Sequence, residues 1–142
     1  MRLRSIAATV IDTQGPITFK RLSDHIARAH GFKRTGRQIS SAVWAACNRV
    51  RTHTATPDGY KVFWPESMQP VGELQFRGFL VEGENREWRE VPYPEKVWLV
   101  KTIAAAGHDD LSRAVAEAIG FGRVTTQFRE EITGIFEKIT SK

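Results

Sequence analysis

The sequence predicts a mainly α-helical protein with a small β component (α+β), built from two helix-turn-helix, winged-helix-like units in tandem. Three observations support this prediction: an internal repeat, apolar residues at helical spacing in both copies, and one strong turn signal between β-prone runs. The chain has 142 residues, which is enough for two small domains. We expect the first unit to carry a β-hairpin wing.

The repeat relates two segments of similar sequence far apart in the chain. Residues 22–38 (LSDHIARAHGFKRTGRQ) align without a gap with residues 111–127 (LSRAVAEAIGFGRVTTQ). Beyond the identical residues, the apolar positions still correspond at the i, i+4, i+7, i+11 spacing of one helical face. These positions are Ile39, Val43, Ala46 and Val50 in the first copy and Phe128, Ile132, Ile135 and Ile139 in the second.

Three helices are expected in the first unit. The first carries an apolar stripe that ends at the sequence Gln-Gly-Pro, residues 14–16. The second ends at Gly31, in the position where a left-handed residue closes a helix. The third begins near Thr35, whose hydroxyl can cap it while Gln38 reaches back, and runs to about Arg51.

The second unit repeats this plan. Pro94, at a first-turn position, opens a helix that ends before Gly107. Asp109 or Asp110 can cap the next helix, which continues to Gly120. The last helix runs from about residue 125 to the C-terminus, so this unit either lacks a wing or is truncated before one.

The predicted wing and connector lie between the two units. Two β-prone runs in residues 50–65 surround Pro57-Asp58-Gly59, a strong turn signal, and Trp64 is expected in the core under this hairpin. Alternation at Leu74 and Phe76, with a turn at residues 83–85, predicts a second hairpin. We therefore divide the chain into a basic winged-helix-like unit (1–68), a β-rich connector (69–93) and an acidic three-helix unit (94–142).

Charge is distributed unevenly along the chain. Residues 1–65 hold 11 Lys+Arg and 3 Asp+Glu, a net of +8, whereas residues 66–142 hold 10 and 13, a net of −3. Concentrated positive charge favours a nucleic-acid partner for the first unit. Neither an apolar run of the roughly 18 residues that a membrane helix needs nor a secretory signal is present, so we expect a cytoplasmic protein without a membrane partner.

The third helix of the first unit supplies the candidate nucleic-acid-binding face. Arg can read guanine or hold phosphate, Asn can pair with adenine, and Ser can bond phosphate. The alternative is a solvated helix face, and Trp44 fits equally well as a residue that packs on a neighbouring unit or protein partner. The candidates in this helix, the preceding turn and the wing are Lys33, Arg34, Arg37, Ser41, Trp44, Asn48, Arg51, His53 and Lys61.

Residue types that carry catalysis or bind metal are not grouped. The four histidines lack metal-site spacing, and the chain has a single cysteine, Cys47, which we expect to pack in the core. The pair Asp109-Asp110 directly precedes an apolar helix, where acids cap rather than catalyse. We therefore expect no enzyme activity, no metal and no cofactor.

The segments Gly15-Pro16-Ile17, Gly31 to Ile39 and Phe63-Trp64-Pro65 resemble a bacterial family, domain of unknown function 3320. Domains of that family typically lie near the C-terminus of very large superfamily 1 helicase-related proteins, often beside a Vsr-like nuclease domain. The resemblance extends over most of the chain, including the second Gly-Phe unit. It implies an excised piece or standalone relative of an accessory module, because the chain has no GxxxxGK[ST] phosphate loop of its own.

We therefore expect a DNA-binding accessory module of a helicase- or nuclease-type machine. Duplex DNA is favoured over single strands, and the helicase or nuclease domains of a parent protein are further expected partners. The alternative is a protein-interaction or dimerisation module that uses Trp44 and the second unit. Composition does not separate the two, whereas the salt dependence of binding does.

Overall fold

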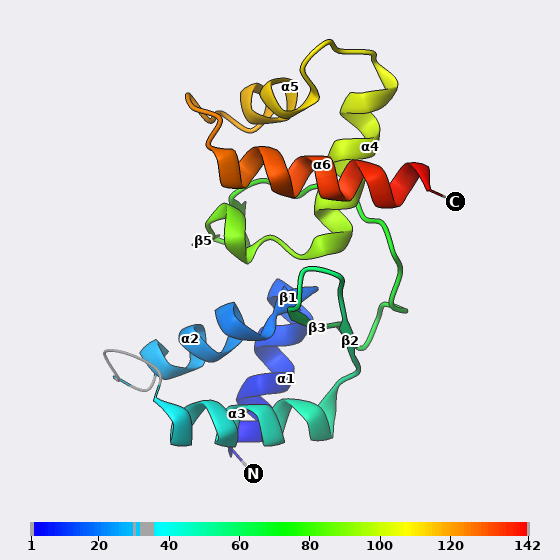
Figure 1. Cartoon of the computed structure of the whole chain (residues 1–142). Coiled ribbons are helices and arrows are strands. Elements are labelled where there is room, and N and C mark those ends of the chain that lie inside the picture. The colour runs from blue at the N-terminus through cyan, green and yellow to red at the C-terminus, as the bar shows by residue number, and fades with distance from the viewer. Residues whose placement is uncertain (1, 30, 32–35, 142) are drawn as a thin grey trace. The chain divides into compact units, whose positions relative to one another are not determined.

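The computed structural model describes residues 2–29, 31 and 36–141. The protein is mainly α-helical with a few short antiparallel strands, as predicted (Figure 1). The chain divides into two compact units, and each is discontinuous in sequence. Unit 1 comprises Met1–Pro70 and Phe79–Pro92, and unit 2 comprises Val71–Gly78 and Tyr93–Lys142.

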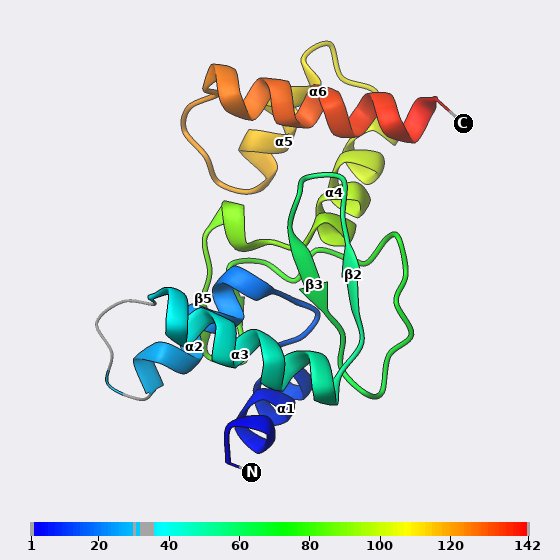
Figure 2. The same cartoon turned by 60° about the horizontal axis from the view of Figure 1, so that its bottom comes forward.

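Unit 1 has the element order of a winged helix. Three helices pack together, and a three-stranded antiparallel sheet of order β1-β3-β2 joins them. Figure 2 shows β2 and β3 side by side as a hairpin that follows α3, which confirms the predicted wing. The elements are α1 (Arg2–Gln14), β1 (Ile17–Thr18), α2 (Phe19–Ala29), α3 (Arg37–Val50), β2 (His53–Ala55) and β3 (Lys61–Phe63).

Two glycines mark the helix ends that the sequence predicts. After α1, a Cβ on Gly15 would collide with the carbonyl oxygen of Ile11 and lie 2.9 Å from Cδ of Pro65, so this corner requires glycine. After α2, Gly31 has φ +84°, the left-handed conformation expected of a closing residue.

The core of unit 1 joins the helices to the sheet. Cys47 is fully buried within it, and burial raises the pKa of its thiol to about 12, so the thiol stays protonated and packs as an apolar group. Trp64 is also buried, as predicted, and its indole N–H donates to the hydroxyl of Thr54 at 3.0 Å. The core residues are Ala7, Ile11, Ile17, Leu22, Ile26, Val43, Ala46, Cys47 and Phe63.

A tight hairpin formed by β4 (Leu80–Val81) and β5 (Glu84–Asn85) follows in unit 1, and a short 3₁₀ helix, η1 (Trp88–Glu90), comes after it. Both turn residues, Glu82 and Gly83, have positive φ, as a two-residue hairpin turn requires. The hairpin around residue 83 was predicted. The predicted alternation at residues 74–76 was wrong as a strand signal, because that segment has no regular structure and lies in unit 2.

Unit 2 contains three helices, α4 (Tyr93–Ala105), α5 (Leu111–Ala118) and α6 (Thr126–Thr140). Their capping follows the sequence signals. The Asp110 side chain accepts a hydrogen bond from the backbone N–H of Arg113, and Thr125 accepts one from Phe128. Gly120 has φ +84°, the value found at its counterpart in unit 1. Among the described residues of this unit no strand is present.

The segment 71–78 is anchored to α4 by a buried carboxylate. Glu95 is fully buried and accepts hydrogen bonds from the backbone N–H and the guanidinium of Arg77, both at 2.8 Å. A buried carboxylate requires such partners. The expected connector is therefore shared between the units: residues 71–78 pack with α4, and residues 79–92 pack with unit 1.

The two copies of the repeat bury side chains at equivalent positions. In both units the third helix packs on the first and the second. Equivalent positions are buried in both copies, so the shared apolar pattern produces the same internal packing. These pairs are Ile26 and Val115, Ala27 and Ala116, Val43 and Ile132, and Ala46 and Ile135.

The two units differ in charge. Unit 1 holds 13 Lys+Arg and 8 Asp+Glu, a net of +5, and unit 2 holds 8 of each, a net of zero. Unit 2 is therefore neutral rather than acidic, because the acidic excess of the second half lies in residues 66–92, which hold 3 basic and 6 acidic residues. No described helix has the length and apolar character needed to cross a membrane.

Candidate nucleic-acid interface

The outward face of α3 is polar, basic and free of acids. Residues 37–50 contain no Asp or Glu, so nothing on this helix repels phosphate. The inward face is fixed by burial of Val43, Ala46 and Cys47. The exposed residues are Arg37, Gln38, Ser41, Ala42, Ala45, Asn48 and Arg49.

A groove of about 610 Å³ runs beside this face, between α3 and the start of α1. Arg4 of α1 and Arg49 of α3 both line it, together with Asn48. Ala42 and Ala45 have small side chains that project little from the middle of this face, so a base edge or a sugar-phosphate backbone could approach the helix closely. The groove therefore carries two cations around small side chains.

Arg37, Ser41 and Asn48 are the predicted residues that the structure brings together on this face. Lys33 and Arg34 lie outside the described residues, as does Thr35, the predicted helix cap. The N-cap position of α3 is occupied by Gly36, which has no side chain to accept from the first-turn N–H groups.

Trp44 and His53, which the sequence analysis placed among the candidate nucleic-acid-binding residues, pack against other aromatic rings of unit 1. Trp44 is half-buried and makes edge contacts with Phe19 and Phe63, at ring-centroid distances of 5.1 and 5.4 Å. His53 of β2 lies 4.9 Å from the Trp44 ring. These four rings join the wing to α2 and α3, so Trp44 packs within its own unit and positions the wing.

Arg51 is held away from the exposed face of α3 by an ion pair. Its Nε donates to Oδ1 of Asp12 at 2.8 Å, and the same carboxylate accepts the backbone N–H of Glu66. The hydrogen bond from Arg51 holds the pKa of Asp12 below its usual value. Arg51 thus fastens the end of α3 to α1, and its charge is largely neutralised by Asp12, a contact that helical spacing could not reveal.

This ion pair gives unit 1 a pH-dependent stability. Because the folded-state pKa of Asp12 is depressed, its contribution is present above the unfolded value and is lost as pH falls through the folded value. We expect Asp12→Asn to lower the free energy of unfolding by less than about 1 kcal/mol near neutral pH, and the difference to shrink below about pH 4. Urea unfolding at both pH values measures it, and a difference that persists unchanged at low pH would contradict the assignment.

The wing contributes little positive charge. Lys61 is exposed at the start of β3, whereas Asp58 lies in the connecting turn and accepts hydrogen bonds from the Thr56 hydroxyl and the Tyr60 N–H. One cation and one carboxylate therefore lie close together in sequence. We expect the wing to approach a nucleic acid through Lys61 alone.

Arg4 and Arg49 are candidate residues that sequence reasoning missed. The sequence-based stripe was centred on Trp44, whereas the exposed face is centred on Ser41, Ala45 and Asn48. The burial of Trp44 by the wing causes this rotation. Measuring the stripe from the buried positions of α3 alone would have placed Arg49 on the accessible side.

The fold and this face define unit 1 as a winged-helix unit with an exposed, acid-free third helix. Residues 1–41 match the family described as protein of unknown function (DUF3320). The match covers α1, β1, α2 and the start of α3 and supports the resemblance over this part, although the sequence suggested that it would extend over most of the chain. No curated protein and no solved structure matches the chain.

Proposed function

We propose that unit 1 binds duplex DNA by placing α3 in the major groove. The observation that carries the proposal is the outward face of α3, where Arg37, Ser41, Asn48 and Arg49 surround two alanines with no carboxylate on the helix. A helix of this kind fits the width of the major groove. No titratable cluster with catalytic geometry is part of this proposal, and the protein acts by binding.

The polar side chains have separate roles in this arrangement. Arg37 and Arg49, at opposite ends of α3, hold phosphates or guanine edges, and Ser41 bonds phosphate. Asn48 is placed to pair with adenine. Arg4 and Lys61 add phosphate contacts from α1 and the wing. Most of these contacts are to the backbone, so the expected sequence preference is weak.

Several acids of unit 1 are already neutralised by neighbours, which leaves the field of the free cations in place. Asp12 pairs with Arg51, and Asp24 pairs with Lys20 at 2.8 Å. Glu87 pairs with Arg89 at 2.9 Å. The exposed arginines of α1 and α3 take part in none of these pairs and stay available to phosphate.

The family resemblance supports a further part of the proposal. We propose that the chain serves as an accessory module that positions DNA for a helicase- or nuclease-type partner, which supplies the catalysis. The matched residues 1–41 contain the first two helices of the binding unit and the start of the third. DNA binding by the isolated chain is the first requirement of this role.

A salt titration tests the proposed function. Affinity of the full chain for a fluorescent duplex, a single strand of the same sequence and an RNA duplex is measured by anisotropy. About four phosphate contacts predict a fall of roughly 100-fold for duplex DNA between 50 and 200 mM salt. Absence of binding at low salt, or affinity that does not change with salt, would overturn the proposal, and tighter RNA binding would replace DNA as the partner.

A further inference from the structure

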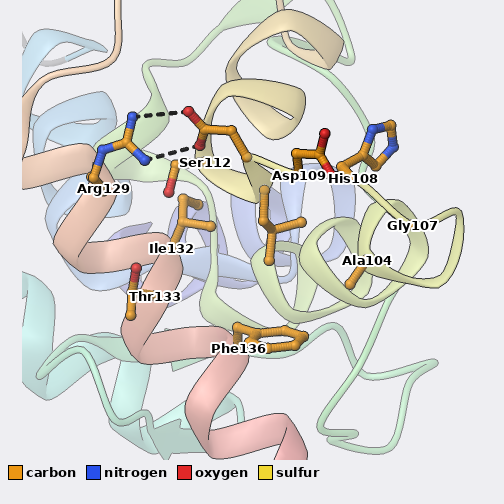
Figure 3. Close-up of a pocket in the computed structure, with 11 residues that line it drawn as sticks. Ala104, Gly107, His108, Asp109, Ser112, Arg129, Ile132, Thr133 and Phe136 are labelled. Atoms are coloured by element: carbon orange, nitrogen blue, oxygen red, sulfur yellow. Dashed lines mark hydrogen bonds and ion pairs between the residues drawn. The ribbon is translucent and has the colours of Figure 1, made fainter.

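A second groove, of about 620 Å³, lies entirely within unit 2. It opens between the end of α4, the loop before α5 and one side of α6. Figure 3 shows Ile132 and Phe136 projecting from α6 toward the loop that contains Gly107, His108 and Asp109. Ile132 is fully buried at its floor, whereas Phe136 is 37% exposed.

The internal repeat identifies what covers this place in unit 1. With the register that pairs Leu22 with Leu111, the groove residues His108, Ile132, Thr133 and Phe136 correspond to Phe19, Val43, Trp44 and Cys47. Those four residues of unit 1 lie in or against the core that also contains Phe63 of β3. The groove of unit 2 is thus the counterpart of the site where the wing strand packs in unit 1.

Side chains at equivalent repeat positions are covered in unit 1 and exposed in unit 2. Cys47 is fully buried under the sheet, but Phe136 at the same repeat position keeps more than a third of its surface exposed. Trp44 fills space beside Phe63 in unit 1, whereas the smaller Thr133 leaves that space open in unit 2. An aromatic side chain inserted at this place would lie against Thr133, as Phe63 lies against Trp44 in unit 1.

The rim of the groove sets the polar chemistry of an occupant. Asp110 and Arg129 form an ion pair with a nitrogen-oxygen distance of 2.9 Å, which fixes one wall. Asp109 is exposed at the same rim, and no described residue pairs with its carboxylate. A basic residue beside the inserted aromatic ring would meet this carboxylate.

We propose that the groove of unit 2 is a docking site for an extended segment of a partner protein, which inserts one aromatic side chain as Phe63 does in unit 1. The segment carries a basic residue close to the aromatic one, in the way that Lys61 precedes Phe63 in β3. Unit 1 completes its fold with its own wing, and unit 2 takes the equivalent strand from outside. The site is separate from α3 and does not depend on DNA binding.

A peptide copying the protein's own wing, residues 52–65, is the probe. It is titrated into the full chain labelled with ¹⁵N, and amide shifts are followed by NMR. We expect shifts concentrated at Gly107, Thr133 and Phe136, and at least tenfold weaker binding of the same peptide carrying Phe63→Ala. The absence of groove shifts at millimolar peptide, or equal binding of both peptides, would overturn the proposal.

Two tryptophan variants separate the groove from the rest of α6. Thr133→Trp restores in unit 2 the ring that contacts Phe63 in unit 1, so we expect it to strengthen peptide binding at least tenfold. Gln127→Trp adds the same side chain at an exposed position of α6 outside the groove and should leave binding within twofold. Equal effects of the two variants would contradict the site.

Sedimentation of the free chain identifies the other possible occupant. A monomer across the concentration range is the result expected for a site that awaits a different protein. Self-association that Thr133→Trp strengthens and Gln127→Trp leaves unchanged would show that a second copy fills the groove, and this would overturn the assignment to a different partner. Since DNA is absent from both measurements, their outcome is independent of the function of unit 1.

Discussion

Replacing Arg4, Arg37 and Arg49 together with alanine is expected to weaken duplex DNA binding by about 100-fold near 100 mM salt. Each arginine is exposed, and together they flank the acid-free face of α3. Loss of three phosphate contacts should also make the slope of log affinity against log salt shallower by roughly 2.7. Anisotropy titrations at four salt concentrations measure both quantities.

The matched control removes the same charge from unit 2. Arg113, Arg123 and Lys138 are exposed there, and replacing them with alanine lowers the net charge by the same amount. We expect a loss of less than about threefold, because none of these three side chains belongs to the face of α3 that is proposed to contact phosphate. Equal losses in the two triple variants would mean that overall charge drives binding, and the assignment to α3 would have to be withdrawn.

Replacing Phe63 with alanine is expected to lower the free energy of unfolding of unit 1 by about 3–5 kcal/mol. Phe63 is fully buried and belongs to both the helical core and the ring cluster with Phe19, Trp44 and His53. Its removal leaves a cavity where the wing meets α3. Urea unfolding followed by circular dichroism measures the loss.

An exposed apolar residue of the same unit gives the comparison. Leu80 is 62% exposed on β4, so its replacement by alanine should change stability by less than about 0.5 kcal/mol. A similar cost at both positions would indicate that the wing contributes no more than an ordinary surface contact. The wing strand would then be a poor template for an occupant of the groove in unit 2.

Local signals in the sequence accounted for most of the fold. The left-handed glycines at 31 and 120, the cap at Asp110 and the hairpin around residues 57–59 act within a few residues, so their sequence patterns are sufficient to place them. The shared apolar spacing of the repeat then fixed which face of each third helix is buried.

The features that sequence reasoning missed depend on partners distant in the chain. Arg51 looks like a surface cation in sequence, but Asp12 binds it from 39 positions away. Residues 71–78 gave an alternating pattern, yet their placement depends on the buried carboxylate of Glu95. The face of α3 was predicted with a rotation error because the wing, and not the helix, decides that Trp44 is covered.

Each unit is built from two separate pieces of the chain, and this limits where the coding sequence could be cut without disrupting a unit. The chain passes from one unit to the other at residues 70–71, 78–79 and 92–93, so no single break in the sequence separates the two units. A coding sequence that begins at Tyr93 would retain α4 to α6 but lose the guanidinium of Arg77, which pairs with the buried carboxylate of Glu95. Recombination is therefore expected to move both units together as one inherited block.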